Sequence, residues 1–366
     1  MKKFFTIAVA ALFAVCMSAQ MRVWVNGSIN YERDLSLIDS ITFVKVTTPA
    51  EQQPEEPANP NFHATAFTVN REGKQVYFSQ GNLQYQASTN TWRFAENQYD
   101  AIGEGISNIS STNEGWIDLF GWGTSGYDNT ANDPFAINYQ PWSTSYDRLM
   151  QTVTIKGTEI ESINCDMKPI TGKCDTTWVG GGTYESRDNN CYGYGPSTFM
   201  ADKNLTGTNA NYDWGVFNAI VNGGNQKDKW RTLSYEEWYY IFYTRNLAQY
   251  LRSQATVCGV HGYVLLPDDF TLPDGLSWSY QTNDWDTNTY NAQAWSAMEA
   301  TGAVFLPAAG YRKGTGCGGV GSRGCYWSSS YYDKEKARYV NITDSGVNFY
   351  SNERFYGQSV RLVQDL

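Results

Sequence analysis

The stretch Trp230-Arg231-Thr232-Leu233-Ser234-Tyr235-Glu236-Glu237-Trp238 carries the clearest structural signal in this sequence. Ser234 followed three residues later by Glu237 forms a capping box, which marks the start of a helix. Apolar residues then recur at the i, i+3 and i+4 positions of one helix face, at Trp238, Ile241 and Phe242. The stretch therefore predicts a capped helix that packs on a core through an aromatic and aliphatic face.

Two further helices are expected in the middle of the chain. Asp213 can cap a helix that stops at Gly223-Gly224 and carries apolar residues on one side, namely Val216, Phe217, Ile220 and Val221. Another is expected from about Asn291 to Gly302, with Ala294, Trp295 and Met298 within it. Helices are thus few, and they lie between two regions with strand-like patterns.

Strand-like runs lie on both sides of these helices. Residues 75–79, 82–86 and 91–95 are separated by short turns and predict an antiparallel meander. Residues 338–342, 346–350 and 359–363 predict three final strands that pair antiparallel. The combination predicts an α+β fold with antiparallel strands and a few helices.

The first 61 residues differ from the rest of the chain. Lys2 and Lys3 precede a twelve-residue apolar run and a small-residue cleavage site, so residues 1–20 are expected to be a secretory signal peptide. A lipid anchor on Cys16 is disfavoured, because Val15 occupies the position where a lipobox has a small residue. Residues 21–48 are expected to form a short β segment with strands at 22–25 and 39–44, and the Pro- and Glu-rich residues 49–61 a linker. The main domain then covers residues 62–366.

An even number of cysteines remains after removal of the signal peptide, namely Cys165, Cys174, Cys191, Cys258, Cys317 and Cys325. In an exported chain this favours disulfides over free thiols or zinc ligands. Cys317 and Cys325 flank a glycine-rich turn and are the expected local pair. Three of the six lie between about residues 150 and 210, where little periodicity is visible, so that segment is expected to be a disulfide-stapled insertion.

Composition excludes several classes of function. Hydrophobic residues make up 41% of the 366 residues, enough for a globular core, and charged residues only 17%. The net charge of −10 and the lack of a basic stripe give no electrostatic basis for binding nucleic acid. The two histidines, His63 and His261, are too few for most metallohydrolase sites.

Eight phrases of the main domain occur in an order that resembles the Fibrobacter major paralogous domain of secreted bacterial proteins. They are VYFSQGNLQY (76–85), GWIDLFGWGTSG (115–126), YDWG (212–215), WRTLSYEEW (230–238), LLPDD (265–269), FLPAAGYR (305–312), YWSS (326–329) and GQSVRLV (357–363). The resemblance covers about residues 64–366 and leaves residues 150–210 unmatched.

The resemblance implies a C-type-lectin-like fold, which is shared by sulfatase-modifying (formylglycine-generating) enzymes and by variable receptors diversified by retroelements. The 230–238 phrase is similar to the signature of the enzyme branch, but we expect Arg231 to pair with a carboxylate or carbonyl inside the domain. The enzyme relatives use a late cysteine pair, and Cys317 and Cys325 lie outside any matching motif. Catalysis is therefore not carried over, and the fold alone implies binding without a specificity.

Three chemical motifs have simpler explanations. The G-x-G-x-x-G match at residues 316–321 leads into Cys325-Tyr326-Trp327-Ser328 in an exported chain and lacks the βαβ context of a dinucleotide site, so a nucleotide site is not expected. His261 lies in a turn flanked by glycines, and no nucleophile elbow exists to complete a triad. Residues 283–286 offer oxygen ligands of the kind that calcium prefers, without the spacing of a helix-loop-helix site. Calcium is the one cofactor that the sequence leaves open.

The region from residue 326 to 354 alternates aromatic residues with Ser, Asn and Asp, which is the composition of recognition surfaces. The expected ligand contacts are Trp327, Tyr331, Tyr332, Asp333, Tyr339, Asn348, Tyr350 and Asn352. Tyrosines at alternate strand positions also pack ordinary sheets, so this interpretation competes with a structural one.

The first hypothesis is therefore a noncatalytic binding module that is secreted or held at the bacterial cell surface. It would recognise a glycan or protein and would associate with a membrane only peripherally. The second is an enzyme of the sulfatase-modifying or glycan-hydrolysing type, since the sequence holds ample carboxylates for a glycosidase pair. The third is a structural envelope or fimbrial component.

Overall fold

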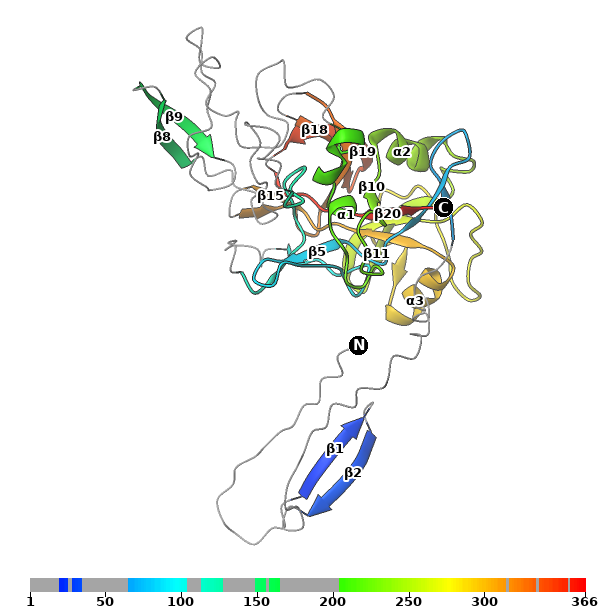
Figure 1. Ribbon diagram of the computed structural model, residues 1–366. Helices are drawn as coiled ribbons and strands as arrows, with labels where there is room; N and C mark the ends of the chain where they lie inside the picture. Colours follow the sequence, from blue (N-terminus) through cyan, green and yellow to red (C-terminus); the bar gives the residue numbers. More distant parts are fainter. Residues whose placement is uncertain are drawn as a thin grey trace. The chain divides into compact units, whose positions relative to one another are not determined.

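The computed structural model describes residues 65–103, 113–127, 204–313, 316–333, 336–354 and 356–366 in full, and the backbone of residues 20–25, 28–34, 149–155 and 158–164. The chain divides into two compact units, Met1–Pro57 and Ala58–Leu366. In the first unit, β1 (Gln20–Val25) and β2 (Ser28–Asp34) form an antiparallel hairpin (Figure 1). The first expected strand is present within β1. The strand expected at residues 39–44 lies outside the described residues.

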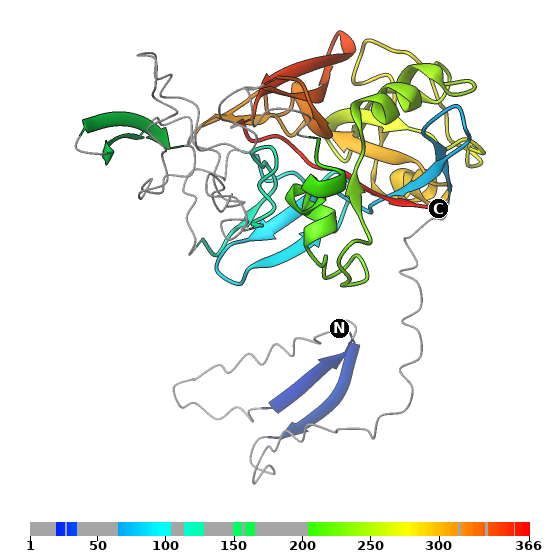
Figure 2. The ribbon, with the colours of Figure 1, turned by 45° about the horizontal axis from the view of Figure 1, so that its top comes forward.

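The second unit is a mixed α+β structure of several small, mostly antiparallel sheets with few helices (Figure 2). One four-stranded sheet has the order β10-β20-β4-β3, built from β3 (Phe67–Thr68), β4 (Gln75–Phe78), β10 (Arg231–Thr232) and β20 (Leu362–Asp365). The C-terminal strand β20 thus lies between β10 and β4. This differs from the expected pairing of the last three strands, because β20 leaves its sequence neighbours and joins strands from the start and middle of the unit.

The expected meander is split between two sheets. β5 (Leu83–Gln86) and β6 (Thr91–Phe94) form the predicted hairpin, and β7 (Trp116–Ile117) pairs with the other edge of β5. β4 does not pair with β5, because its two edges are taken by β3 and β20. Gly81 marks the break between β4 and β5, where an added Cβ would lie 2.6 Å from the carbonyl oxygen of Ala95.

A second four-stranded sheet has the order β13-β11-β12-β14. It contains β11 (Arg252–Val257), β12 (Val260–Leu265), β13 (Thr289–Tyr290) and β14 (Val304–Pro307). The two-residue turn Cys258-Gly259 joins β11 to β12 with φ of 51° and 81°, the left-handed values that a tight hairpin needs. The predicted helix α3 (Ala292–Ala300) follows β13, and the Asn291 side chain accepts from the Ala294 N–H at its start.

The capping box is confirmed. The Ser234 hydroxyl accepts from the Glu237 N–H while Glu237 accepts from the Ser234 N–H, and helix α2 (Tyr235–Tyr239) begins there. The helix continues as the π-helical turn η5 (Tyr240–Thr244), and its predicted face, Trp238, Ile241 and Phe242, is buried. Asp213 also caps a helix as predicted, but α1 (Trp214–Phe217) is only four residues long and follows the short helix η4 (Gly207–Tyr212).

A three-stranded antiparallel sheet with the order β17-β18-β19 precedes the C-terminal strand β20. It consists of β17 (Arg323–Tyr331), β18 (Lys336–Thr343) and β19 (Gly346–Glu353), which enclose two of the three expected final strands. The small hairpin of β15 (Tyr311–Lys313) and β16 (Gly316–Gly318) precedes it. Figures 1 and 2 both place helix α2 next to this sheet, and buried Trp238 packs in one cluster with Tyr326 and Val340.

The region from 150 to 210 holds a hairpin that its sequence did not reveal. β8 (Leu149–Ile155) pairs with β9 (Thr158–Asn164) in antiparallel register. Cys165, Cys174 and Cys191 lie outside the described residues, so the expected disulfide-stapled insertion stays a prediction. Within the described part of the chain, no helix is long and apolar enough to span a membrane.

Candidate ligand-binding surface

The register of the β17-β18-β19 sheet brings six of the eight predicted contact residues to one face. Side chains directly opposite each other point to the same side of a sheet. The rows across the three strands are Trp327, Tyr339 and Tyr350; Cys325, Asn341 and Asn348; and Tyr331, Ala337 and Asn352. We call this side the Tyr339 face. Its composition is aromatic in one row and amide-rich in the flanking rows.

The accessible part of the Tyr339 face lies towards strand β19, which forms the edge of the sheet. Tyr350 is 52% exposed, and its ring lies 6.4 Å from that of half-buried Tyr339. Asn348 is exposed and Asn352 half-buried on either side of Tyr350. Tyrosine rings beside amide groups can stack on an apolar ligand face and hydrogen-bond its hydroxyls or amides.

Trp327 does not belong to this accessible part. It is fully buried, its indole N–H donates to the Phe120 carbonyl at 2.7 Å, and its ring packs edge-on against Tyr339 at 6.1 Å. As a ligand contact Trp327 is therefore a wrong prediction, because the loops of residues 113–127 cover it. Its role is to support Tyr339 from below. Burial raises the pKa of Tyr339, so its phenol is neutral at physiological pH.

Tyr332 and Asp333 lie at the end of β17, away from the Tyr339 face. The Asp333 carboxylate accepts from the Lys336 N–H at 2.7 Å, and its carbonyl accepts from the Arg354 guanidinium, so Asp333 closes the turn into β18. Tyr332 is half exposed, and the Arg338 guanidinium lies 4.9 Å from the centre of its ring. The structure thus places Tyr332 beside Arg338, on the opposite side of the sheet, and Asp333 in the turn between β17 and β18.

That opposite side, which we call the Phe349 face, carries an aromatic cluster that the sequence interpretation missed. Tyr235, Tyr239 and Tyr243 recur every four residues along α2 and η5 and form a tyrosine ridge with ring spacings of 6.3 and 5.1 Å. Phe349 of β19 lies within 5.4 to 5.7 Å of all three rings. The i, i+4, i+8 spacing of the tyrosines was the available signal, overlooked because the core face of the same helix gave the stronger pattern.

Two arginines flank the tyrosine ridge. The Arg338 guanidinium lies 4.2 Å from the ring centre of Tyr235, and that of Arg252 lies 4.5 Å from the ring centre of Tyr243. Arg252 also donates to the hydroxyl of Tyr263 at 3.2 Å. Among the described residues, neither arginine forms an ion pair with a carboxylate.

Arg231 lies on the other side of the helix start and is already neutralised. Its guanidinium donates to both oxygens of Glu237 at 2.7 Å and to Asp365 at 2.6 Å, and Lys74 also contacts Asp365 at 3.0 Å. The expectation that Arg231 pairs inside the domain is confirmed. An open groove of about 610 Å³ runs past this cluster, and within it Lys74 and Arg231 are paired with Glu237 and Asp365.

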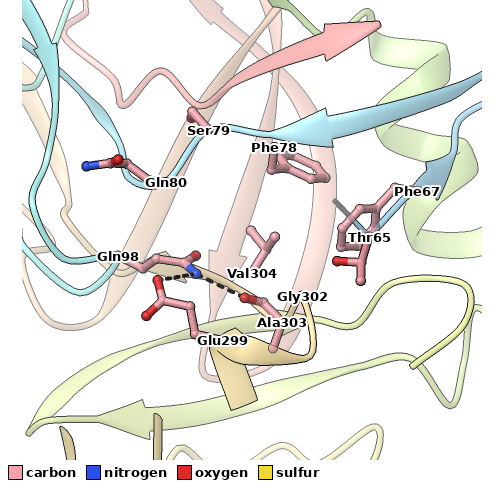
Figure 3. A pocket seen from close by; sticks show the side chains of 10 residues that line it. All are labelled: Thr65, Phe67, Phe78, Ser79, Gln80, Gln98, Glu299, Gly302, Ala303 and Val304. Carbon is pink, nitrogen blue, oxygen red and sulfur yellow. Dashed lines mark hydrogen bonds between the residues drawn. The ribbon is translucent and has the colours of Figure 1, made fainter. Parts of the chain in front are cut away.

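The interior holds a buried polar network around Gln98, and Figure 3 shows its bonds to Glu299 and Ala303. The Gln98 amide donates to Glu299 and to the Ala303 carbonyl, both at 2.9 Å, and accepts from the Phe305 N–H and from Arg361. Arg361 is completely buried, and burial lowers its pKa to about 10, so it stays charged at neutral pH. The adjoining cavity measures about 30 Å³, space for a water molecule rather than an organic ligand.

The predicted disulfide between Cys317 and Cys325 is wrong. Cys317 lies on β16 and its thiol donates to the Gly103 carbonyl at 3.4 Å, whereas Cys325 lies on β17 and its thiol faces the Asn341 amide oxygen at 3.8 Å. The turn between them sends the two residues into different sheets. Burial raises the pKa of the Cys325 thiol to about 12. Cys258 is an exposed thiol at the β11–β12 turn.

The acidic loop and His261, which lies on strand β12 rather than in a turn, have structural partners. Asp284 accepts from the Asp286 N–H at 3.0 Å and from the Thr287 hydroxyl at 3.2 Å, so it organises its own loop. His261 contacts the Gly321 carbonyl at 2.8 Å and stacks on Trp285 with a ring distance of 5.5 Å. No group of three or more metal-ligating side chains occurs in the described ranges.

Comparison with known protein families gives one match, in the C-terminal part of the chain. Residues 281–363 match a family described as a domain of unknown function, DUF8237. The matched range contains α3, β14 and the whole β17-β18-β19 sheet, and therefore both of its faces. No curated protein and no solved structure matches the chain.

Proposed function

We propose that this protein is an exported, noncatalytic binding module that recognises a glycan through the Tyr339 face. The observation that carries the proposal is the row of Tyr339 and Tyr350 at a sheet edge, with Asn348 and Asn352 on either side. Tyr350 offers ring area that is half exposed and needs no rearrangement to contact a ligand. Stacking on the tyrosines with hydrogen bonds from the amides is the mechanism of recognition.

The sulfatase-modifying enzyme branch fits less well. The described late cysteines are not joined to each other, and the Cys325 thiol is buried with a pKa of about 12. A nucleophilic cysteine requires the thiolate, so Cys325 is poorly suited to that role at neutral pH. This supports binding over sulfur-based catalysis.

We further propose that the second unit has a C-type-lectin-like fold of the Fibrobacter major paralogous type. In support, three of the resembling phrases meet in one sheet and the helix beside it. The 76–85 phrase contains most of β4, the 230–238 phrase forms β10 and the start of α2, and the 357–363 phrase leads into β20 between them. Phrases far apart in sequence thus act as one scaffold.

The proposal is tested with the secreted mature chain on an array of bacterial and plant glycans. We expect at least one glycan on the array to bind. The Kd for that glycan should rise at least tenfold in Tyr350→Ala, because one stacking contact contributes about 1.4 kcal/mol or more. Tyr280→Ala is the matched control, since Tyr280 is equally exposed and lies outside the β17-β18-β19 sheet. No glycan hit, or a hit that Tyr350→Ala leaves unchanged, overturns the proposal. Turnover of a bound glycan would favour the enzymatic alternative.

A further inference from the structure

The Phe349 face carries a second surface whose chemistry differs from that of the Tyr339 face. Tyr239 and Tyr243 of the tyrosine ridge are 45% and 40% exposed, although both sit on a helix whose other side is fully buried. Their ring positions are held by Phe349 beneath them, and the Tyr243 hydroxyl donates to the Val347 carbonyl at 2.6 Å. The rings are therefore rigid platforms that face solvent.

The tyrosine rings recur at a regular interval along the helix. Residues four apart on a helix advance about 6 Å along its axis, so Tyr235 to Tyr243 gives three like contacts over about 12 Å. Identical contacts at a regular interval suit a ligand that is itself built of repeated rings. A saccharide chain has this property, and its apolar ring faces pack on tyrosine.

Charge defines the class of saccharide. Arg338 at one end of the ridge is held between the rings of Tyr235 and Tyr332, which orients the plane of its guanidinium. Arg252 lies over Tyr243 at the other end. Neither has a carboxylate partner among the described ion pairs, whereas Lys74, Arg93, Arg231 and Arg245 each have one. Guanidinium groups form their strongest hydrogen bonds with carboxylates.

The nearby acids do not neutralise these arginines. Glu236 precedes Glu237 on the helix, and its carboxylate contacts the Ser330 hydroxyl at 3.5 Å. Glu353 lies directly opposite Lys336 at the far end of β18 and β19. From this placement we infer that the tyrosine ridge with Arg338 and Arg252 is a binding site for an acidic oligosaccharide, in which uronic acid carboxylates pair with the arginines and sugar rings pack on the tyrosines.

The test uses the mature full chain and isothermal titration calorimetry with two probes, oligogalacturonate and oligomeric alginate. At least one probe should bind, with an affinity that falls as salt rises. Tyr239→Ala and Arg338→Gln should each weaken binding about tenfold or more, while Tyr350→Ala should leave it unchanged. Both substituted side chains are at least partly exposed, so near-UV circular dichroism should confirm an unaltered fold.

Tyr350→Ala separates this site from the proposed function, since Tyr350 lies on the other face of the sheet and should not affect uronate binding. The inference is overturned if neither probe binds, or if binding survives both ridge substitutions. It is also overturned if neutral cello-oligosaccharides bind equally well, because the arginines would then contribute nothing to binding. Equal binding of poly-glutamate would overturn it too, because the ligand would then be an acidic peptide.

Discussion

Arg231 and Glu237 form a two-pronged ion pair, with Nη1 and Nη2 of the arginine each 2.7 Å from one carboxylate oxygen. The same carboxylate accepts from the Ser234 N–H, so a single side chain both caps helix α2 and anchors strand β10. Asp365 at the end of β20 completes the cluster at 2.6 Å. Arg231 therefore joins helix α2, strand β10 and the C-terminal strand β20.

Replacing Arg231 with alanine should lower the free energy of unfolding by about 1–2 kcal/mol. Hydrogen bonds to charged groups contribute about 1.5–3 kcal/mol, but partial exposure of this cluster weakens them. Urea denaturation followed by tryptophan fluorescence measures the change. Arg71→Ala is the control, because Arg71 is exposed and should change stability by less than about 0.5 kcal/mol. Equal effects of the two substitutions would contradict this role for Arg231.

Replacing Gln98 with alanine should be more costly, about 3 kcal/mol. The substitution removes four hydrogen bonds and leaves the buried charge of Arg361 without its bridge to Glu299. Thermal unfolding of the variant should show a clear fall in Tm. Gln293→Ala, on the exposed side of α3, is the comparison and should be nearly neutral. A loss below 1 kcal/mol in Gln98→Ala would mean that water replaces the amide.

The buried carboxyl of Asp118 should make the fold less stable as pH rises from about 4 to 6. Burial raises its pKa from 3.8 to about 6, with one oxygen accepting from the Ile102 N–H and the other unpaired. The folded state therefore holds a proton that the unfolded state releases in this window, so the contribution of Asp118 to stability is fully present below about pH 4 and is lost as pH rises to about 6. Above pH 6 the full penalty applies.

Asp118→Asn should remove this dependence and raise stability at pH 7 by up to about 3 kcal/mol, the equivalent of two pKa units. Urea titrations at pH 4, 5, 6 and 7 measure both effects. Burial raises the pKa of Asp213 to about 6 as well, so Asp213 gives a pH dependence of the same sign. The slope of unfolding free energy against pH should therefore become smaller in Asp118→Asn without vanishing. A variant whose slope equals that of the wild type would refute the assignment.

The described cysteines should differ in reactivity. Iodoacetamide should modify exposed Cys258 within minutes in the folded protein, whereas Cys325 should react only after unfolding, because it is 2% exposed and its thiol has a pKa of about 12. Peptide mass mapping without reduction makes the measurement. Detection of a Cys317–Cys325 disulfide peptide would contradict the structure. The same map reports whether Cys165, Cys174 and Cys191 are oxidised, as expected of an exported chain.

Local signals were reliable where the pattern itself contains the cause of the structure. The capping box at Ser234 and Glu237 and the caps at Asp213 and Asn291 satisfy helix N–H groups with side chains a few residues away, so the sequence is sufficient to place them. The length of α1 was overestimated, because Ile220 leaves the helix and bridges to Trp92 instead. That contact joins residues 128 positions apart and has no local signature.

The sequence alone determined the mixed α+β character, three helix starts, the strands β1, β4, β5, β6, β18 and β19, and the alternation that gathers Tyr339, Tyr350, Asn348 and Asn352 on one side. Period-two and period-3.6 patterns are properties of neighbouring residues, so they can be read without a fold. Only the tertiary structure decided that β20 pairs with β4 and β10, that Trp327 is buried, that Cys317 and Cys325 lie in different sheets, and that Phe349 meets the tyrosine ridge. Each of these depends on which distant segments exclude water together, and that is settled by packing across the whole domain.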